Sequence, residues 1–182
     1  MTRMSPAVIA RIAGVFYLLT FVSGVVALVV RGTVAVSGGL VAAACYVAVT
    51  LLFYVLFKPV SRTVSLLAAA ISLAGIVVGP LRLTTISPLV FFGAYCLLIG
   101  WLIFTSTYLP RFLGVLMAIA GLGWLTFLSP PLARALSPWV YGPGLLGEGA
   151  LTLWLLVKGV DSRAHSLKPQ ATSRLKPQAS SL

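Results

Sequence analysis

The stretch LLGEGALTLWLLV, residues 145–157, decides the fold class of this chain, because it is too apolar for a helix that lies in water. Its one charged residue, Glu148, is one of only two acidic residues among 182. The rest of the chain is similar, with 60% hydrophobic residues, 8% charged residues and a mean hydropathy of +1.10. Such a composition is typical of proteins that cross a membrane several times. The stretch therefore predicts a membrane-spanning helix with a carboxyl group inside it.

Charged residues and prolines divide the chain into six apolar stretches that are long enough to cross a bilayer. About 20 residues of α-helix span the ~30 Å of hydrocarbon. The stretches are continuous and do not alternate over ~10 residues, so they predict helices and not a membrane barrel. The predicted fold is an all-α membrane bundle over residues 1–160, with spans at 12–30, 38–57, 63–81, 89–109, 112–128 and 139–157.

The basic residues predict the orientation of the spans, since short loops rich in Lys and Arg stay on the cytoplasmic side. Of the 13 Lys and Arg residues, ten fall on the side of the two termini and three on the other side. We therefore expect both termini in the cytoplasm and the protein in a cell inner membrane. The three basic residues expected outside are Arg31, Arg82 and Arg134.

The net charge of +11 is explained by this topology and by the tail, residues 161–182. The tail is polar, rich in Ser, Pro and Gln, and too poor in apolar residues to pack a core. It also lacks the exposed aromatic residues of a nucleic-acid surface. We expect a disordered, basic cytoplasmic tail near anionic lipid headgroups, where each basic residue contributes ~1 kcal/mol. No nucleic acid is expected as a partner.

Small residues recur three or four apart along the third predicted span. Helices in lipid pack closely where small side chains let their backbones approach. The pattern predicts a buried contact within the bundle, and a seam between two copies of the chain is the alternative. The residues are Ser65, Ala68, Ala69, Ser72, Gly75 and Gly79, ending in a Gly-x-x-x-Gly step.

Glu148 is the leading candidate for a functional residue, because ionisable side chains inside a membrane are rare and costly. At 1.5 Å per residue it lies about 15 Å above Lys158. The same counting places Thr20, Thr50 and Ser72 at depths of roughly 12 to 15 Å. We therefore expect a polar layer in which Glu148 is protonated, since burial disfavours the charged form. The carboxyl group is either a structural hydrogen-bond partner or part of a path for protons or solutes.

The sequence offers no residue set for catalysis, a metal or a cofactor. Its one histidine, His165, falls in the tail, and Glu148 and Asp161 are too far apart along the chain to act as a pair. Cys45 and Cys96 fall inside predicted spans without acidic or histidine neighbours, so we interpret them as buried apolar side chains. No phosphate-binding glycine loop or nucleophile with a base is recognisable. We therefore expect no enzyme and no cofactor.

Several segments, taken in order from about residue 8 to residue 160, resemble one known family. The family is a group of bacterial multi-pass membrane proteins named domain of unknown function 4386 (DUF4386). The resemblance implies a helical inner-membrane protein with no assigned activity, cofactor or partner, and it supplies no site residues. The segments are Ala10–Leu19, Lys58–Arg62, Phe91–Gly93, Leu109–Val115 and Gly147–Gly159.

Two classes of function follow from these observations. The first is a non-catalytic membrane component, an accessory or regulatory subunit with a membrane protein partner, which the small-residue pattern and the sparse chemistry favour. The second is a small permease coupled to protons or solutes through Glu148. A permease requires polar helix faces that converge on this carboxyl group.

Overall fold

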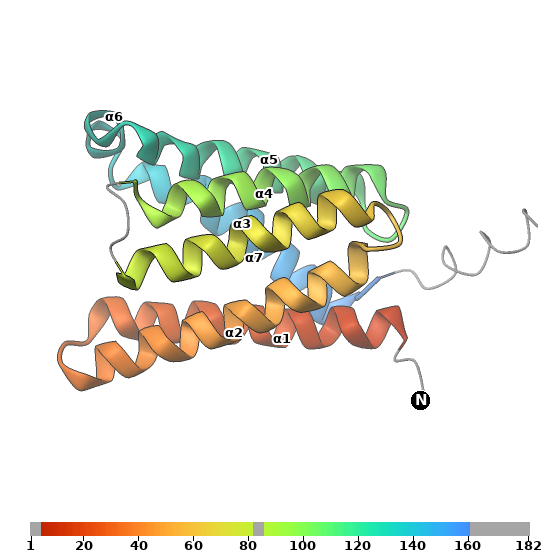
Figure 1. Ribbon diagram of the computed structural model, residues 1–182, viewed down its shortest axis with the longest axis horizontal. Coiled ribbons are helices and arrows are strands. Elements are labelled where there is room, and N and C mark those ends of the chain that lie inside the picture. The colour runs from red at the N-terminus through yellow and green to blue at the C-terminus, as the bar shows by residue number, and fades with distance from the viewer. Residues whose placement is uncertain (1–4, 82–85, 161–182) are drawn as a thin grey trace, which may run out of the picture.

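The computed structural model describes residues 5–81 and 86–160. Within these residues every regular element is a helix, and six segments are long and apolar enough to cross a membrane (Figure 1). The predicted all-α fold with about six spans is confirmed, and the chain is a multi-pass membrane protein. The predicted tail, residues 161–182, lies outside the described residues.

Six long helices are joined by short connections, except between the last two. The long helices are α1 (Pro6–Val29), α2 (Thr33–Phe57), α3 (Arg62–Leu81), α4 (Pro88–Thr105), α5 (Arg111–Leu125) and α7 (Gly142–Val157). Between α5 and α7 lie the 3-10 turns η1 (Thr126–Leu128) and η2 (Trp139–Tyr141), with the short helix α6 (Pro130–Ala135) between them. The sixth predicted span thus begins in η2 and continues in α7.

Local capping explains where the helix ends differ from the predicted spans. α1 starts at Pro6 and not at residue 12, because the Ser5 hydroxyl accepts a hydrogen bond from the Val8 backbone N–H and proline suits the first helical position. α4 ends at Thr105 and not at residue 109, since Ser106 has an extended backbone conformation. Charge and hydropathy alone do not mark such ends.

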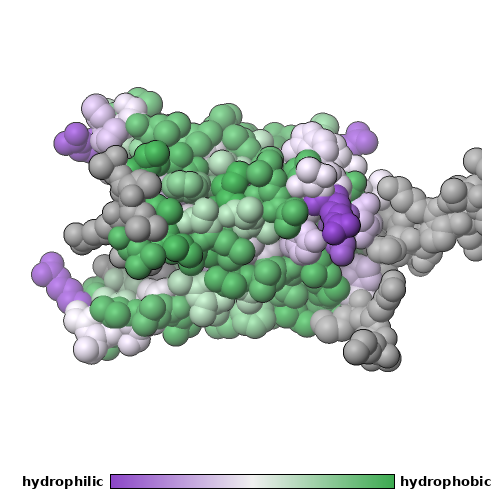
Figure 2. Space-filling model, in the orientation of Figure 1, coloured by the Kyte–Doolittle hydropathy of each residue, from purple (hydrophilic) through white to green (hydrophobic). Residues whose placement is uncertain are grey.

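The six long helices form a closed ring, in which each packs against the next and α7 returns to α1. Their axes follow the long axis of the molecule, and the described chain begins and ends at the same end of the bundle (Figure 1). Apolar residues cover the sides in Figure 2, and polar residues gather at the two ends. This distribution is that of a bundle surrounded by lipid.

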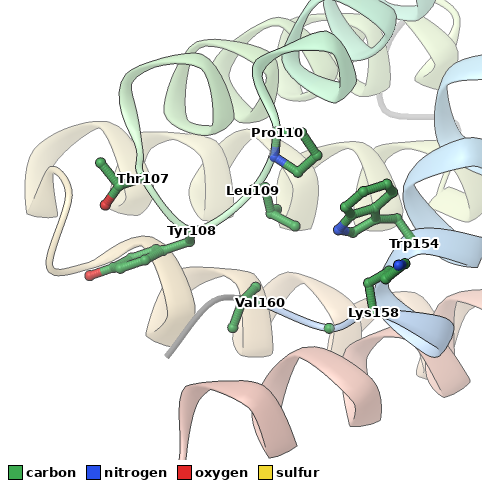
Figure 3. Close-up of a pocket in the computed structure, with 8 residues that line it drawn as sticks. Thr107, Tyr108, Leu109, Pro110, Trp154, Lys158 and Val160 are labelled. Carbon is green, nitrogen blue, oxygen red and sulfur yellow. The ribbon is translucent and has the colours of Figure 1, made fainter. Parts of the chain in front are cut away.

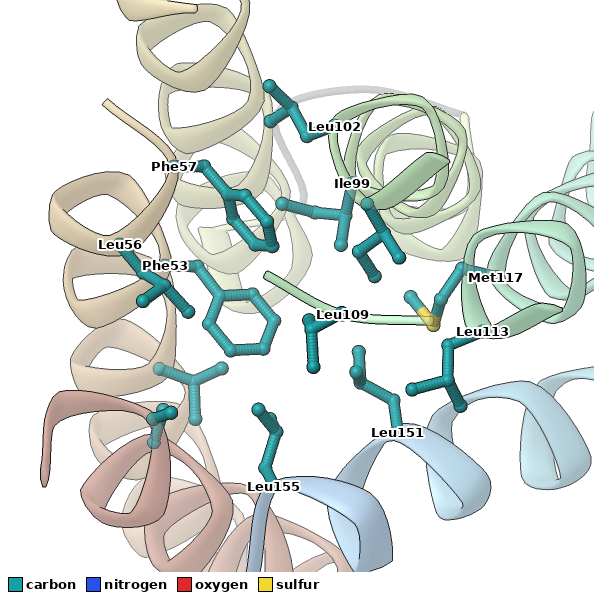
Figure 4. Packing of buried hydrophobic residues seen from close by; sticks show 14 of the residues in the cluster. Phe53, Leu56, Phe57, Ile99, Leu102, Leu109, Leu113, Met117, Leu151 and Leu155 are labelled. Atoms are coloured by element: carbon teal, nitrogen blue, oxygen red, sulfur yellow. The ribbon is translucent and has the colours of Figure 1, made fainter. Parts of the chain in front are cut away.

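Large apolar side chains fill the half of the ring nearest the two chain ends. They come from α2, α4, α5, α7 and the loop between α4 and α5, and they point toward one another (Figure 4). Because lipid is as apolar as this core, tight packing and not the hydrophobic effect must hold the helices together. The side chains drawn include Phe53, Leu56, Phe57, Ile99, Leu102, Leu109, Leu113, Met117, Leu151 and Leu155.

Helices α4 and α5 approach each other closely at two pairs of glycines. A Cβ atom placed on Gly114 would lie 2.7 Å from the Gly100 carbonyl oxygen, and one on Gly93 would lie 2.8 Å from that of Gly121. The partner atoms are backbone, so they cannot turn aside. In each helix the two glycines are about two turns apart, which keeps both pairs on one face. The small-residue pattern in the sequence pointed to α3 and did not predict this contact.

The small-residue face of α3 also packs inside the chain. A Cβ atom on Gly75 would lie 2.9 Å from Phe91 Cβ, and one on Gly79 would lie 3.0 Å from Pro88 Cγ, both on α4. Gly75 is buried in this contact, so it is not exposed for a seam between two copies. The other members, Ser65, Ala68, Ala69 and Ser72, are buried as well.

The part of the α1–α2 hairpin around its loop, residues 18–44, is packed less tightly than the rest of the bundle, and we call it the open half of the hairpin. Between Tyr17 and Cys45, none of the described side chains is buried. Apart from their own helix backbone and chain neighbours, no atom of the described residues lies within 4 Å of the position that a Cβ on Gly24 or Gly39 would take. This half of the hairpin therefore faces its surroundings with its helix backbones partly bare.

Candidate functional site

Glu148 lies inside the ring, only 3% exposed, and both of its carboxyl oxygens have hydrogen-bond donors. The Tyr17 hydroxyl donates to Oε2 over 3.1 Å, and the Trp124 indole N–H donates to Oε1 over 2.8 Å. The two donors come from α1 and α5, while Glu148 is on α7. One carboxyl group therefore connects three helices.

Two glycines on α7 allow close packing at this site, Gly144 against the Trp124 indole and Gly147 against the backbone of α5. A Cβ on Gly144 would fall 2.2 Å from Cζ2 of the Trp124 ring, and one on Gly147 would fall 2.6 Å from the Leu116 carbonyl oxygen. Gly144, Gly147 and Glu148 lie on one helix face, since residues three and four apart are neighbours. The indole lies against the bare backbone of Gly144 and reaches the carboxyl group one turn further along.

Trp124 and Tyr17 differ in the protonation states of Glu148 with which their hydrogen bonds are compatible. An indole N–H can only donate, so Oε1 of Glu148 must accept from Trp124. A phenol can donate or accept, so the Tyr17 contact survives if the carboxyl group is protonated on Oε2 and donates to Tyr17. The geometry therefore accommodates both charge states of Glu148.

A second polar contact joins α2 to α3. The hydroxyls of Thr50 and Ser72 lie 2.7 Å apart, and Thr50 also donates to the Tyr46 carbonyl oxygen over 2.9 Å. Thr50 has one proton, so Ser72 is the donor in the contact between the two hydroxyls. The Ser72 oxygen keeps lone pairs that can accept a further hydrogen bond.

Tyr46 and Tyr95 lie between the Glu148 contacts and the Thr50–Ser72 contact. The rings of Tyr17 and Tyr46 are 6.2 Å apart, and those of Tyr46 and Tyr95 are 5.9 Å apart. The Tyr46 hydroxyl lies near Ser72 and the Tyr95 hydroxyl near Thr50, but neither meets hydrogen-bond geometry. A buried hydroxyl without a partner costs about 1–3 kcal/mol. The layer thus retains hydrogen-bonding capacity that the described residues do not use.

A small cavity of about 160 Å³ adjoins this unused capacity. It lies where α2, α3 and α4 meet, and its polar lining consists of Tyr46 and Ser72. Gly75 and Phe92 are among its apolar walls. The cavity is large enough for a few water molecules or one small solute.

The structure brings three of the four residues predicted for the polar layer into it. The side chains of Tyr17, Tyr46 and Tyr95 lie between Glu148 and the Thr50–Ser72 pair. Thr20 does not join, because it is only partly buried and its hydroxyl donates to the Phe16 carbonyl oxygen of its own helix over 2.9 Å. Such a bond to the preceding turn is common for threonine inside a helix.

Tyr17, Tyr46, Tyr95 and Trp124 were not predicted, because only Glu, Ser and Thr side chains were placed in the polar layer. Their polar atoms lie several ångströms from their own α-carbons, so counting α-carbon depth misplaces them. Including tyrosine and tryptophan among the polar residues would have found them. Cys96 is also buried beside this layer. Within residues 5–81 and 86–160 no group of His, Cys, Asp and Glu could hold a metal ion.

Comparison with known proteins agrees with the resemblance found in the sequence. The family described as domain of unknown function (DUF4386) matches residues 81–159, a range that contains Tyr95, Trp124 and Glu148. An uncharacterised protein of Archaeoglobus fulgidus is 30% identical over 127 residues, which are 62% of this chain and 76% of that protein. No solved structure matches the chain. The chain therefore belongs to the DUF4386 family of multi-pass membrane proteins.

Proposed function

We propose that this protein is a non-catalytic component of the bacterial inner membrane, where it acts as an accessory or regulatory subunit of a membrane complex. The observation that carries the proposal is the state of Glu148. Both carboxyl oxygens are already occupied by donors from α1 and α5. A carboxyl group engaged in this way holds helices in place, and its hydrogen bonds are worth most where water is excluded.

The open half of the α1–α2 hairpin supports a partner in the membrane. Glycine inside a helix costs about 1 kcal/mol relative to alanine, so its presence calls for a packing reason. Gly100 and Gly114 have that reason within this chain, whereas Gly24 and Gly39 have no neighbouring atom. A transmembrane helix of a second protein, packed against these two glycines, supplies the missing contact.

The distribution of charge supports cytoplasmic termini. Lys58, Arg62, Arg111 and Lys158 belong to the bundle end where the described chain begins and finishes, as does Arg11. At the other end the described basic residues are Arg31 and Arg134. The excess of basic residues at the first end is what retention in the cytoplasm requires.

Co-purification from native membranes tests the accessory role. A partner recovered with the wild-type protein should be lost with Gly39→Leu, because the larger side chain blocks close helix approach. The matched control is Gly149→Leu, which also adds a side chain to open space but lies on α7 next to buried residues, and not in a stretch without any. Quantitative mass spectrometry would compare the three samples. Equal recovery of every co-purifying protein from all three would contradict the proposal.

A second function, a small proton- or solute-coupled permease, is favoured by one specific observation. The unpartnered hydroxyls of Tyr46 and Tyr95 extend the polar layer from Glu148 toward the 160 Å³ cavity. The variant Glu148→Gln separates the two functions without removing either contact. Its amide oxygen can accept from Trp124, and its NH₂ group can donate to the Tyr17 oxygen.

Liposomes containing the purified protein and a trapped pH-sensitive dye provide the measurement. If the protein is a permease, an imposed membrane potential drives proton entry, and Glu148→Gln abolishes it while thermal stability is retained. If the protein is an accessory subunit, wild-type and variant liposomes behave like empty ones. Partner recovery in the preceding experiment should then be unchanged in Glu148→Gln.

A further inference from the structure

A second cavity, of about 460 Å³, lies at the bundle end that carries most of the described basic residues. One side is the loop between α4 and α5, residues 107–110, and the other is the end of α7, with Trp154 and residues 158–160 (Figure 3). Leu109 and Val160 are buried beneath it. The cavity is separate from the polar layer around Glu148.

The donors at this cavity are positive or polar, and the described residues do not use them. Trp154 and Lys158 are one helical turn apart and both line the cavity. Among the described residues the Trp154 indole N–H and the Lys158 ammonium group make no hydrogen bond or ion pair. Arg11 lies near this end of the cavity without lining it, since its Nε would be 3.9 Å from a Cβ on Gly159.

The start of α5 adds further donors at the rim. Pro110 precedes the helix and supplies no side-chain cap, so the first backbone N–H groups of α5 have no acceptor from it. A helix N-terminus carries about half a positive charge. The C-terminal end of α7 opposes it with about half a negative charge, but the full charges of Lys158 and Arg11 exceed that. Partial burial raises the pKa of the Tyr108 phenol, so this side chain adds no negative charge.

The occupant must also fit an apolar wall. The Phe112 and Trp154 rings are in edge contact, with centroids 5.6 Å apart, and Phe112 is half exposed. Phe112 is in the first turn of α5, a helix that runs from the cavity along the bundle, as the acyl chains of a bound lipid would. Trp residues are enriched at this depth because the ring is apolar and its N–H is polar.

We propose that this cavity binds the phosphate headgroup of an anionic phospholipid, with Lys158 and the Trp154 indole as donors, the positive charge of Arg11 nearby, and acyl chains along Phe112. The site recognises one negatively charged lipid at a defined position, unlike the diffuse attraction expected of the tail. It does not depend on what Glu148 does.

Native mass spectrometry of the full, delipidated protein tests the site with phosphatidylglycerol, phosphatidylcholine and inorganic phosphate as probes. Wild-type protein should bind the first phosphatidylglycerol more tightly than phosphatidylcholine. Lys158→Gln should weaken that step about fivefold, which corresponds to the ~1 kcal/mol of one basic residue at the surface. Trp154→Phe should weaken it by about threefold, since it removes one hydrogen bond of roughly 0.6 kcal/mol.

The matched control is Arg134→Gln, which removes one charge from the opposite end of the bundle and should leave the first binding step within twofold of wild type. Lys158 is exposed, so its variant should unfold at the wild-type temperature. Equal binding of the two lipids would overturn the proposal. So would an equal loss in Arg134→Gln, or displacement of the lipid by millimolar inorganic phosphate.

Discussion

Glycines have opposite surroundings in the α4–α5 contact and in the open half of the α1–α2 hairpin. Gly93, Gly100, Gly114 and Gly121 admit the backbone of the neighbouring helix to within 2.7–2.8 Å of a Cβ position. Gly39, on the hairpin, has nothing within 4 Å. In lipid both regions are equally apolar, so hydropathy does not distinguish a packed helix face from an open one. Geometry between helices distinguishes them, and substitutions at packed and at open positions measure the difference.

The largest effect is expected for Gly114→Leu. A Cβ there would meet the Gly100 carbonyl oxygen at 2.7 Å and the Phe104 backbone nitrogen at 3.0 Å, so α4 and α5 must separate. Overpacking of this kind costs about 3 kcal/mol when the neighbour is backbone. We expect a clearly lower unfolding temperature in detergent, followed by tryptophan fluorescence. Wild-type stability in this variant would show that the contact is looser than described.

The next largest effect is expected for Trp124→Phe, which leaves Oε1 of Glu148 without a donor. Loss of a buried hydrogen bond to an acidic group costs about 2 kcal/mol. Tyr17→Phe should cost less, about 1 kcal/mol, because its bond is longer and the ring is kept. The double variant should differ from the sum of the two, because both donors share one carboxyl group. Strict additivity would mean that the two bonds are independent.

A smaller effect is expected for Thr50→Val, which removes the contact with Ser72 between α2 and α3. Hydrogen bonds between membrane helices contribute about 0.6 kcal/mol. Thr20→Val is the matched control, since Thr20 bonds only to its own helix at Phe16. It should change the free energy of unfolding by less than Thr50→Val does. Urea or SDS titration of the two variants side by side would show whether Thr20 lies outside the polar layer.

The smallest effect is expected for Gly39→Leu in the purified protein, within about 0.5 kcal/mol of wild type. The added side chain has open space around it, and leucine favours helix more than glycine does. The same substitution that leaves the isolated protein unchanged should remove a partner in the native membrane. A large loss of stability in detergent would instead place another part of this chain on the hairpin.

Much of the polar layer could be predicted because a carboxyl group in an apolar helix demands partners. Depth along each span correctly places Thr50 and Ser72 beside each other, since rise per residue is constant in a helix. Depth does not give the direction a side chain faces, and Thr20 fails for that reason. It also does not give the reach of long side chains. Tyr17 and Trp124, whose polar ends donate hydrogen bonds to Glu148, were therefore not predicted.

The sequence by itself determined that this protein lies in a lipid bilayer and how many times it crosses it. Both depend on local quantities, which are the apolarity of a segment and its length against the thickness of a bilayer. Only the tertiary structure decided which glycines touch a helix, which donors Glu148 receives, and that the ring closes from α7 to α1. Those properties depend on the rotation of each helix about its axis. In lipid that rotation is set by side-chain fit between neighbours and not by hydropathy.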